Sequence, residues 1–92
     1  MFWVYILRCS NGSYYVGSTS DLERRIAEHQ DGTYCGWTAR RRPVELVFAN
    51  QTDSHDQAFR LEHQIKGWSR AKKEALIAGD FDLLVELSRR RT

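Results

Sequence analysis

The chain has 92 residues, enough for one small domain that buries only about two-thirds of its unfolded surface. It carries 14 basic and 12 acidic residues, and the formal net charge of +2 excludes a strong overall attraction to polyanions. Cys9 and Cys35 are too few for a disulfide framework and are not spaced as metal ligands, so we interpret them as free thiols in a reducing compartment. The apolar N-terminal run is too short to span a bilayer, and we expect a cytoplasmic protein without a membrane partner.

Residues 1–8 and 14–18 are predicted to be two strands joined by a turn. The first stretch is rich in aromatic and β-branched residues and is almost continuously apolar, which is typical of a central strand. The segment Ser10-Asn11-Gly12-Ser13 between the two stretches has the composition of a tight turn. Residues 45–50 are predicted to be a third strand, so we expect an antiparallel sheet of at least three strands.

The length of the first turn decides which face of the sheet each tyrosine occupies. A two-residue loop pairs Tyr5 with Ser18 and places Tyr5 and Tyr15 on opposite faces. A three-residue loop with Gly12 left-handed pairs Tyr5 with Gly17 and places both tyrosines on one face. We favour the second register, because a glycine opposite Tyr5 leaves room for its ring.

A helix is expected after the second strand, with Ser20 and Glu23 as a capping box and its end near Gln30. A helical wheel places Leu22, Arg25, Ile26 and His29 within one arc of about 100°. Arg24 points almost the other way. His29 is equally well explained as a hydrogen-bonded core residue, but an arginine on an apolar face needs a specific partner.

Residues 33–43 are expected to form a loop that contains Trp37 and the triplet Arg40-Arg41-Arg42. An exposed aromatic ring beside guanidinium groups suits nucleic acid, because bases stack on the ring and cations contact phosphates. The alternatives are that Trp37 packs the loop down and that the arginines are merely solvated. A second basic cluster, at residues 89–91, is better explained as a solvated helix end.

Three further helices are predicted in the C-terminal half. Ser54 caps the first, which ends at Gly67; residues 69–78 form a short one, and the last begins at Phe81 and ends near Arg90, with an apolar stripe that covers the core. Glu62 lies inside the apolar arc of the first of these helices. A lone inward carboxylate is costly, so Glu62 is either a metal ligand or paired with Lys66 one turn later.

The tripeptides Trp3-Val4-Tyr5 and Tyr15-Val16-Gly17 resemble those of the GIY-YIG nucleases, with Trp3 in place of the first glycine. The resemblance continues through residues 17–25 to His29 and Glu62, covers nearly the whole chain, and is closest to the short single-domain bacterial members. It implies an α/β fold of the α+β type, with a small three-stranded antiparallel sheet flanked by helices in one domain over residues 1–92. One departure is that no asparagine follows Glu62.

The resemblance implies a metal-dependent endonuclease that hydrolyses phosphodiester bonds. Glu62 is expected to hold one Mg²⁺ or Mn²⁺, and Arg25 to grip the phosphate. Tyr5 is implied as the group that activates water, while Tyr15 and His29 position it or relay protons. Because tyrosine is a poor base at its usual pKa of about 10, neighbouring cations are expected to favour the phenolate.

Nucleic acid is the expected partner, with DNA favoured over RNA. Its contacts are expected from Trp37, Arg40, Arg41, Arg42 and Lys66. We expect no appended recognition domain of the kind that larger family members have, and therefore weak specificity or specificity supplied by a protein partner. Two other classes remain open: a nucleic-acid-binding module that does not cleave, and a small interaction protein whose polar cluster is only part of its core.

Overall fold

The computed structural model describes residues 1–89, which form three strands and five helices. The strands are β1 (Phe2–Arg8), β2 (Tyr14–Thr19) and β3 (Glu45–Thr52). The helices are α1 (Leu22–Asp31), α2 (Gly36–Ala39), α3 (His55–Lys66), α4 (Arg70–Ala78) and α5 (Phe81–Arg89). Within residues 1–89, none of these helices combines the length and the apolar character that a membrane crossing requires.

The three strands form one antiparallel sheet in the order β2-β1-β3. The central position predicted for the first strand is therefore confirmed, and β2 lies at an edge of the sheet. Pairing between β1 and β3 shifts by one residue between Ile6 and Leu7, which is a β-bulge. The edge position of β2 leaves one side of that strand free of a neighbouring strand within the described sheet.

The hairpin between β1 and β2 has the three-residue loop that we favoured. The Cys9 backbone N–H donates to the Ser13 carbonyl at 2.8 Å, and Gly12 has a φ of +85°, a left-handed value that favours glycine. In the resulting register Tyr5 pairs with Gly17 and Leu7 with Tyr15. Both tyrosines consequently lie on the same face of the sheet.

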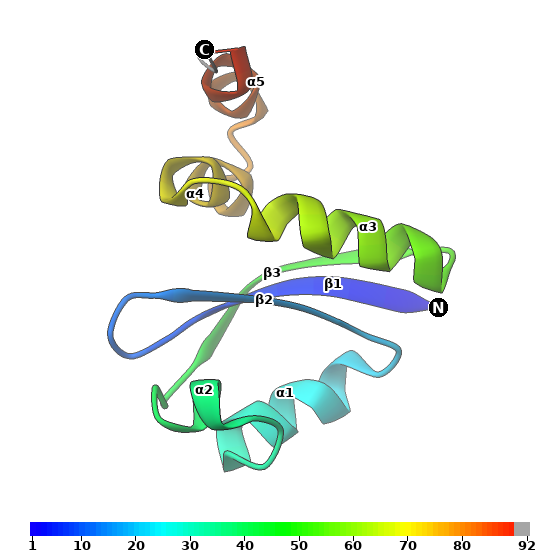
Figure 1. The fold of residues 1–92 in the computed structure, drawn as a ribbon, viewed down its shortest axis with the longest axis vertical. Coiled ribbons are helices and arrows are strands. Elements are labelled where there is room, and N and C mark those ends of the chain that lie inside the picture. The colour runs from blue at the N-terminus through cyan, green and yellow to red at the C-terminus, as the bar shows by residue number, and fades with distance from the viewer. Residues whose placement is uncertain (90–92) are drawn as a thin grey trace.

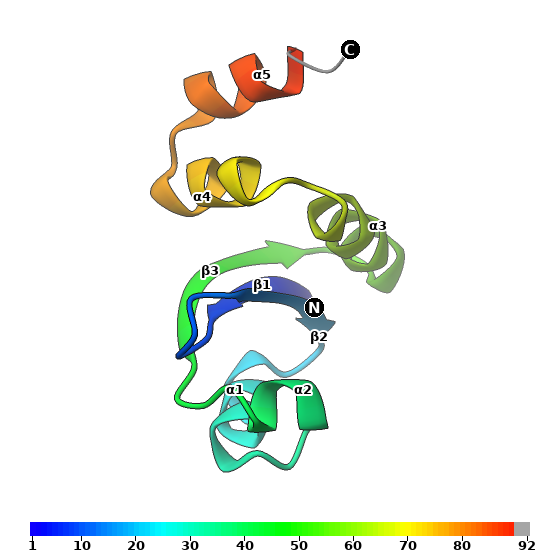
Figure 2. The same cartoon turned by 60° about the vertical axis from the view of Figure 1, so that its left-hand side comes forward.

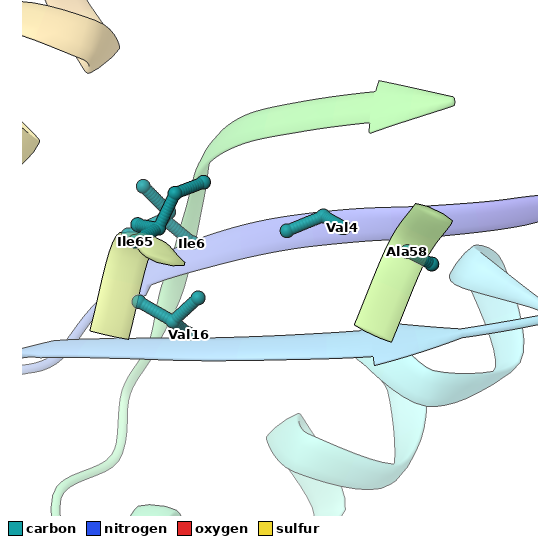
Figure 3. Packing of buried hydrophobic residues seen from close by; sticks show 5 residues of the cluster. All are labelled: Val4, Ile6, Val16, Ala58 and Ile65. Atoms are coloured by element: carbon teal, nitrogen blue, oxygen red, sulfur yellow. The ribbon is translucent and has the colours of Figure 1, made fainter. Parts of the chain in front are cut away.

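Helices cover both faces of the sheet. Helices α1 and α2 lie on one side and α3 and α4 on the other, while α5 lies beyond α4 and away from the sheet (Figures 1 and 2). Because successive side chains of a strand point to opposite faces, β1 contributes to two separate cores. Val4 and Ile6 join Val16, Ala58 and Ile65 beneath α3 (Figure 3). On the other face the buried cluster comprises Tyr5, Leu7, Cys9 and Val44.

The first helix begins one residue later than predicted. Its N-cap is Asp21, whose side chain accepts the Arg24 backbone N–H at 3.2 Å, and the expectation of a Ser20 cap is wrong. The reason is that β2 continues to Thr19, whose hydroxyl accepts the Asp21 backbone N–H at 3.1 Å and holds that residue at the cap. Gly32, with a φ of +79°, ends the helix.

Two other elements differ from the sequence prediction. The segment 33–43 contains the short helix α2 and is not a continuous loop. The predicted apolar stripe of α5, Phe81, Leu84 and Val85, does not cover a core: Phe81 and Val85 are 62 and 52% exposed, Leu84 is half-buried, and no described residue of that helix is buried. The expected helix end near Arg90 lies outside the described residues, as do two of the three arginines in the cluster 89–91.

Candidate active site at the edge of the sheet

Gly17 allows the Tyr5 hydroxyl to reach the edge strand. A Cβ atom at position 17 would lie 2.5 Å from the Tyr5 hydroxyl oxygen and 2.7 Å from its Cζ, far inside van der Waals contact. Tyr5 is fully buried, so its ring cannot easily move aside. The glycine therefore permits this close approach between β1 and β2, as the register argument predicted.

Tyr5 is hydrogen-bonded to the histidine of α1. The Tyr5 hydroxyl lies 2.8 Å from Nε2 of His29, which is also fully buried, and Nδ1 of His29 lies 2.9 Å from the Thr38 hydroxyl. The Tyr15 ring packs beside both residues, at centroid distances of 6.3 Å from Tyr5 and 5.0 Å from His29. The structure thus brings Tyr5, Tyr15 and His29 together on one face of the sheet.

Arg25 turns inward, and Arg24 turns to solvent. Arg25 donates from Nη1 to the Ser18 carbonyl of β2 at 3.1 Å, and its guanidinium carbon lies 3.8 Å from the centroid of the Tyr34 ring. Its Nε atom is buried without a hydrogen-bond partner, although Glu28 lies 3.5 Å away. The Arg24 side chain is 76% exposed. This confirms the helical-wheel prediction that the two arginines face different ways.

Glu62 approaches the same edge strand from the other face of the sheet. Its Oε1 accepts a hydrogen bond from the Ser18 hydroxyl at 2.5 Å, and its Oε2 lies 2.6 Å from Nζ of Lys66. Ser18 therefore contacts Arg25 through its carbonyl and Glu62 through its side chain. The sequence left Glu62 either as a metal ligand or as the partner of Lys66, and the structure contains the Glu62–Lys66 ion pair.

Burial dominates the protonation of the aromatic cluster. It raises the pKa of Tyr5 to about 12, although the Arg25 guanidinium opposes the shift, and it also raises the pKa of Tyr15. The expectation that neighbouring cations favour a phenolate is therefore wrong for the protein by itself, because desolvation outweighs them. Burial, aided by the charge of Arg25, lowers the pKa of His29 to about 4, so this imidazole is neutral at pH 7.

The Glu62 carboxylate remains ionised despite its partial burial. Burial alone would raise its pKa, but hydrogen bonds from Lys66 and Ser18 lower the pKa below its usual range. Residues 1–89 contain no cluster of three or more His, Cys, Asp or Glu side chains able to hold a metal ion. A cation at Glu62 would therefore take most of its ligands from water or phosphate oxygens, an arrangement that suits Mg²⁺.

Trp37 and the arginine triplet lie beside the aromatic cluster, but they are partly engaged within the protein. The Trp37 ring is 37% exposed, with the Tyr15 ring centroid 5.7 Å away and the Arg41 guanidinium carbon 4.0 Å from its own centroid. Arg42 donates to the Ala39 carbonyl at 2.9 Å. Trp37 thus packs the segment down and still exposes part of its ring.

The triplet and Lys66 do not form one continuous group. Arg40 is the C-cap residue of α2, whereas Lys66 is in the last turn of α3, on the other side of the sheet, and is paired with Glu62 (Figure 1). Cys9 and Cys35 are both free, as predicted, and Cys9 is buried. Three residues in the site were not identified from the sequence: Ser18, Tyr34 and Thr38. Only Ser18, directly after the Tyr-Val-Gly tripeptide, lay next to a recognisable signal.

Comparisons with known proteins agree on one family. The GIY-YIG catalytic domain profile matches residues 1–75. A UPF0213 protein of Natronomonas pharaonis is 46% identical over 78 residues, which covers 85% of this chain and 92% of that protein. A UPF0213 protein of Halobacterium salinarum is 47% identical over 76 residues, covering 83% of this chain and 99% of that protein.

Solved structures of similar proteins share the fold. The solution NMR structure of a UPF0213 protein from Bacillus halodurans is 42% identical, has a TM-score of 0.56, and covers 85% of this chain and 84% of that chain. A solution NMR structure from E. faecalis is 35% identical, with a TM-score of 0.59 and coverage of 88% and 85%. The profile matches most of the chain, and the structure places the tyrosine pair, His29, Arg25 and Glu62 around one edge strand. The chain belongs to the GIY-YIG catalytic domain family.

Proposed function

We propose that the protein is an endonuclease that hydrolyses a phosphodiester bond of nucleic acid, DNA in particular, with one divalent cation. The observation that carries the proposal is the convergence on Ser18 and Gly17 of groups from both faces of the sheet. Tyr5 and His29 come from one face and Glu62 from the other, and the Ser18 carbonyl holds the Arg25 guanidinium. Ser18 lies on an edge strand and is only half-buried, so we propose that a phosphate approaches the site from the Ser18 side.

Arg25 is the group suited to binding the phosphate. Its side chain is 21% exposed, so part of the guanidinium reaches solvent even though Nε is buried beside Glu28. The guanidinium is oriented by the Ser18 carbonyl and by the Tyr34 ring. A cation fixed in this way stabilises the charge that develops on the phosphate oxygens without further reorganisation.

Tyr5 and His29 are suited to taking the proton of the attacking water. The Tyr5 hydroxyl would accept the water proton while passing its own to Nε2 of His29, 2.8 Å away. The high pKa of Tyr5 argues for this concerted transfer and against a preformed phenolate. A bound phosphate would bring negative charge close to His29 and Arg25, which raises the histidine pKa and makes it a better proton acceptor.

Glu62 fits the role of cation ligand. Its ionised carboxylate is only 13% exposed, while the Lys66 side chain opposite is 50% exposed and able to move away into solvent. Mg²⁺ or Mn²⁺ held there would supply Lewis-acid stabilisation of the phosphate and leaving oxygen. Contacts with the rest of the nucleic acid are proposed for Trp37, Arg40, Arg41, Arg42 and Lys66.

The test is cleavage of branched, nicked and single-stranded DNA and of RNA, with Mg²⁺, Mn²⁺ or a chelator. Tyr5→Phe removes only the hydroxyl at the proposed site, and we expect it to abolish metal-dependent cutting. Tyr14→Phe is the matched control: this residue is in the same hairpin, but its hydroxyl donates to Glu74 at 3.1 Å. Equal activity of the two variants, or no cutting by the wild type under any condition, would reject the proposal.

A non-cleaving nucleic-acid-binding module is the second candidate. It is favoured by the Glu62–Lys66 ion pair, since both carboxylate oxygens already have partners. For that function we expect binding that weakens steeply with salt, because cations released from the phosphate backbone drive it, and no product in the cleavage assay.

A further inference from the structure

Thr38 is the residue through which α2 contacts the proposed site. It is fully buried, and its hydroxyl lies 2.9 Å from Nδ1 of His29, on the side of the imidazole ring opposite the Tyr5 contact. A buried hydroxyl is costly unless it is hydrogen-bonded, and the shortest polar contact of this one is to the histidine of the site. The short helix α2 therefore has a buried polar contact with His29 in addition to its packing.

The surroundings of Thr38 indicate the direction of its hydrogen bond to His29. The Thr38 hydroxyl donates to the Cys35 carbonyl at 3.4 Å, three residues earlier, as threonine commonly does within a helix. A hydroxyl has one proton to donate and two acceptor positions. The Cys35 sulfur also lies 3.3 Å from this hydroxyl. When the Thr38 proton is directed to Cys35, the Thr38 oxygen is the acceptor in the contact with His29 and the imidazole proton is on Nδ1.

The surroundings of Tyr5 lead independently to the same tautomer. Against the effect of burial, the nearby Arg25 guanidinium lowers the pKa of the Tyr5 hydroxyl, and a guanidinium has only donor groups to offer that hydroxyl. The Tyr5 proton is then free to point at Nε2 of His29, which has to be unprotonated to accept it. The contacts on both sides of the ring are satisfied together when the proton is on Nδ1 and the lone pair on Nε2.

We propose that Thr38 is a positioning residue that fixes the Nδ1–H tautomer of His29, so that Nε2 is held ready to take the proton of Tyr5. The effect of this tautomer on cleavage rests on the proposed nuclease function. The tautomer itself is a property of the protein without substrate. An imidazole in the Nε2–H form would donate to Tyr5 and could not accept its proton.

The tautomer is measured by NMR on protein labelled with ¹⁵N-histidine at neutral pH. In the wild type we expect a protonated-type shift for Nδ1 of His29 and an unprotonated-type shift for Nε2. Thr38→Val keeps the shape but removes the hydroxyl, and we expect the Nε2–H form to appear; Thr38→Ser restores the hydroxyl and the wild-type pattern. A wild-type His29 protonated on Nε2, or no change in Thr38→Val, overturns the proposal. If Thr38→Val does not fold, the wild-type tautomer and Thr38→Ala decide it by the same criteria.

Cleavage provides the functional measurement. We expect Thr38→Val to lower kcat by about 10- to 100-fold with little change in KM, as is usual for residues that orient a functional group, and Thr38→Ser to recover most of the rate. Thr52→Val is the matched control, because Thr52 is also largely buried but its hydroxyl lies between the Phe2 and Ser54 carbonyls, which share its single proton. If Thr38→Val cleaves at the wild-type rate, the role of Thr38 is refuted but the proposed nuclease function is not. If the wild type does not cleave, the nuclease function is refuted, and the NMR result still decides the tautomer.

Discussion

Acidification should destabilise the protein through His29. The unfolded histidine titrates near its ordinary pKa of 6.5, whereas burial and the charge of Arg25 lower the folded value to about 4. Between these values the unfolded state binds a proton that the folded state does not, so stability must fall as the pH falls. The contribution is fully present above pH 6.5 and is lost progressively as the pH decreases toward 4.

The size of the effect follows from the two pKa values. Each unit of difference corresponds to about 1.4 kcal/mol, and integration gives a loss of about 2 kcal/mol between pH 7 and pH 5 and about 3 kcal/mol by pH 4. The free energy of unfolding of a small domain is only about 5–15 kcal/mol. The loss by pH 5 is therefore large enough to measure by urea unfolding.

The assay compares the wild type with His29→Gln, whose amide keeps hydrogen-bonding capacity but does not titrate. The remaining titratable groups are the same in both proteins, so their contributions largely cancel in the comparison. We expect the wild type to lose about 2 kcal/mol more than the variant between pH 7 and pH 5. Equal losses in the two proteins, or a His29 ring that titrates near 6.5 by NMR, would refute the reasoning.

Two further predictions concern Gly17 and Arg25. Gly17→Ala should destabilise the fold by about 1–3 kcal/mol in urea unfolding and abolish cleavage, because the new Cβ would lie 2.5 Å from the Tyr5 hydroxyl; a stable and active variant would contradict this. Arg25→Ala should lower the cleavage rate by at least about 100-fold, and Arg24→Ala by no more than about 3-fold, because only the first contacts β2. Comparable losses in the two variants would show that the positive charge acts diffusely.

The sequence predicted the hairpin register and the inward side of α1, for physical reasons. Turn composition and the need for a glycine opposite Tyr5 determined the pairing, and one helical wheel separated Arg25 from Arg24. These features depend on neighbours in the chain or on a single pair of strands. Local patterns are sufficient for such features.

Other features depended on tertiary packing and could not be predicted. Helix α2 has only four residues, too few for a periodic pattern, so Thr38 gave no signal of its contact with His29. The pKa of Tyr5 depends on a burial that outweighs the nearby cation, and the sequence shows the cation but not the burial. The apolar stripe of α5 resembled core cover, yet the helix lies away from the sheet (Figure 2).

Glu62 has a close structural counterpart in the same protein. Glu74 of α4 is also paired with a cation four residues away, Arg70 at 3.2 Å, and also accepts a hydrogen bond from a hydroxyl, that of Tyr14. The two glutamates contact opposite ends of β2: Glu62 accepts from Ser18, whose carbonyl also binds Arg25, whereas Glu74 accepts from Tyr14 at the start of the strand. Glu74→Gln is therefore a control for the loss of an ion pair by itself.

The most direct test of the metal-dependent nuclease is the Mg²⁺-dependent cleavage rate of Glu62→Gln per folded molecule, measured beside Glu74→Gln with the melting temperature of each sample. We expect Glu62→Gln to remain folded and to lose at least about 100-fold in rate, because the amide no longer attracts a divalent cation, while Glu74→Gln cuts as the wild type does. If Glu62 is only the partner of Lys66, the substitution leaves the lysine unpaired and lowers the melting temperature. A Glu62→Gln protein that melts early yet cleaves at the wild-type rate per folded molecule would contradict the account.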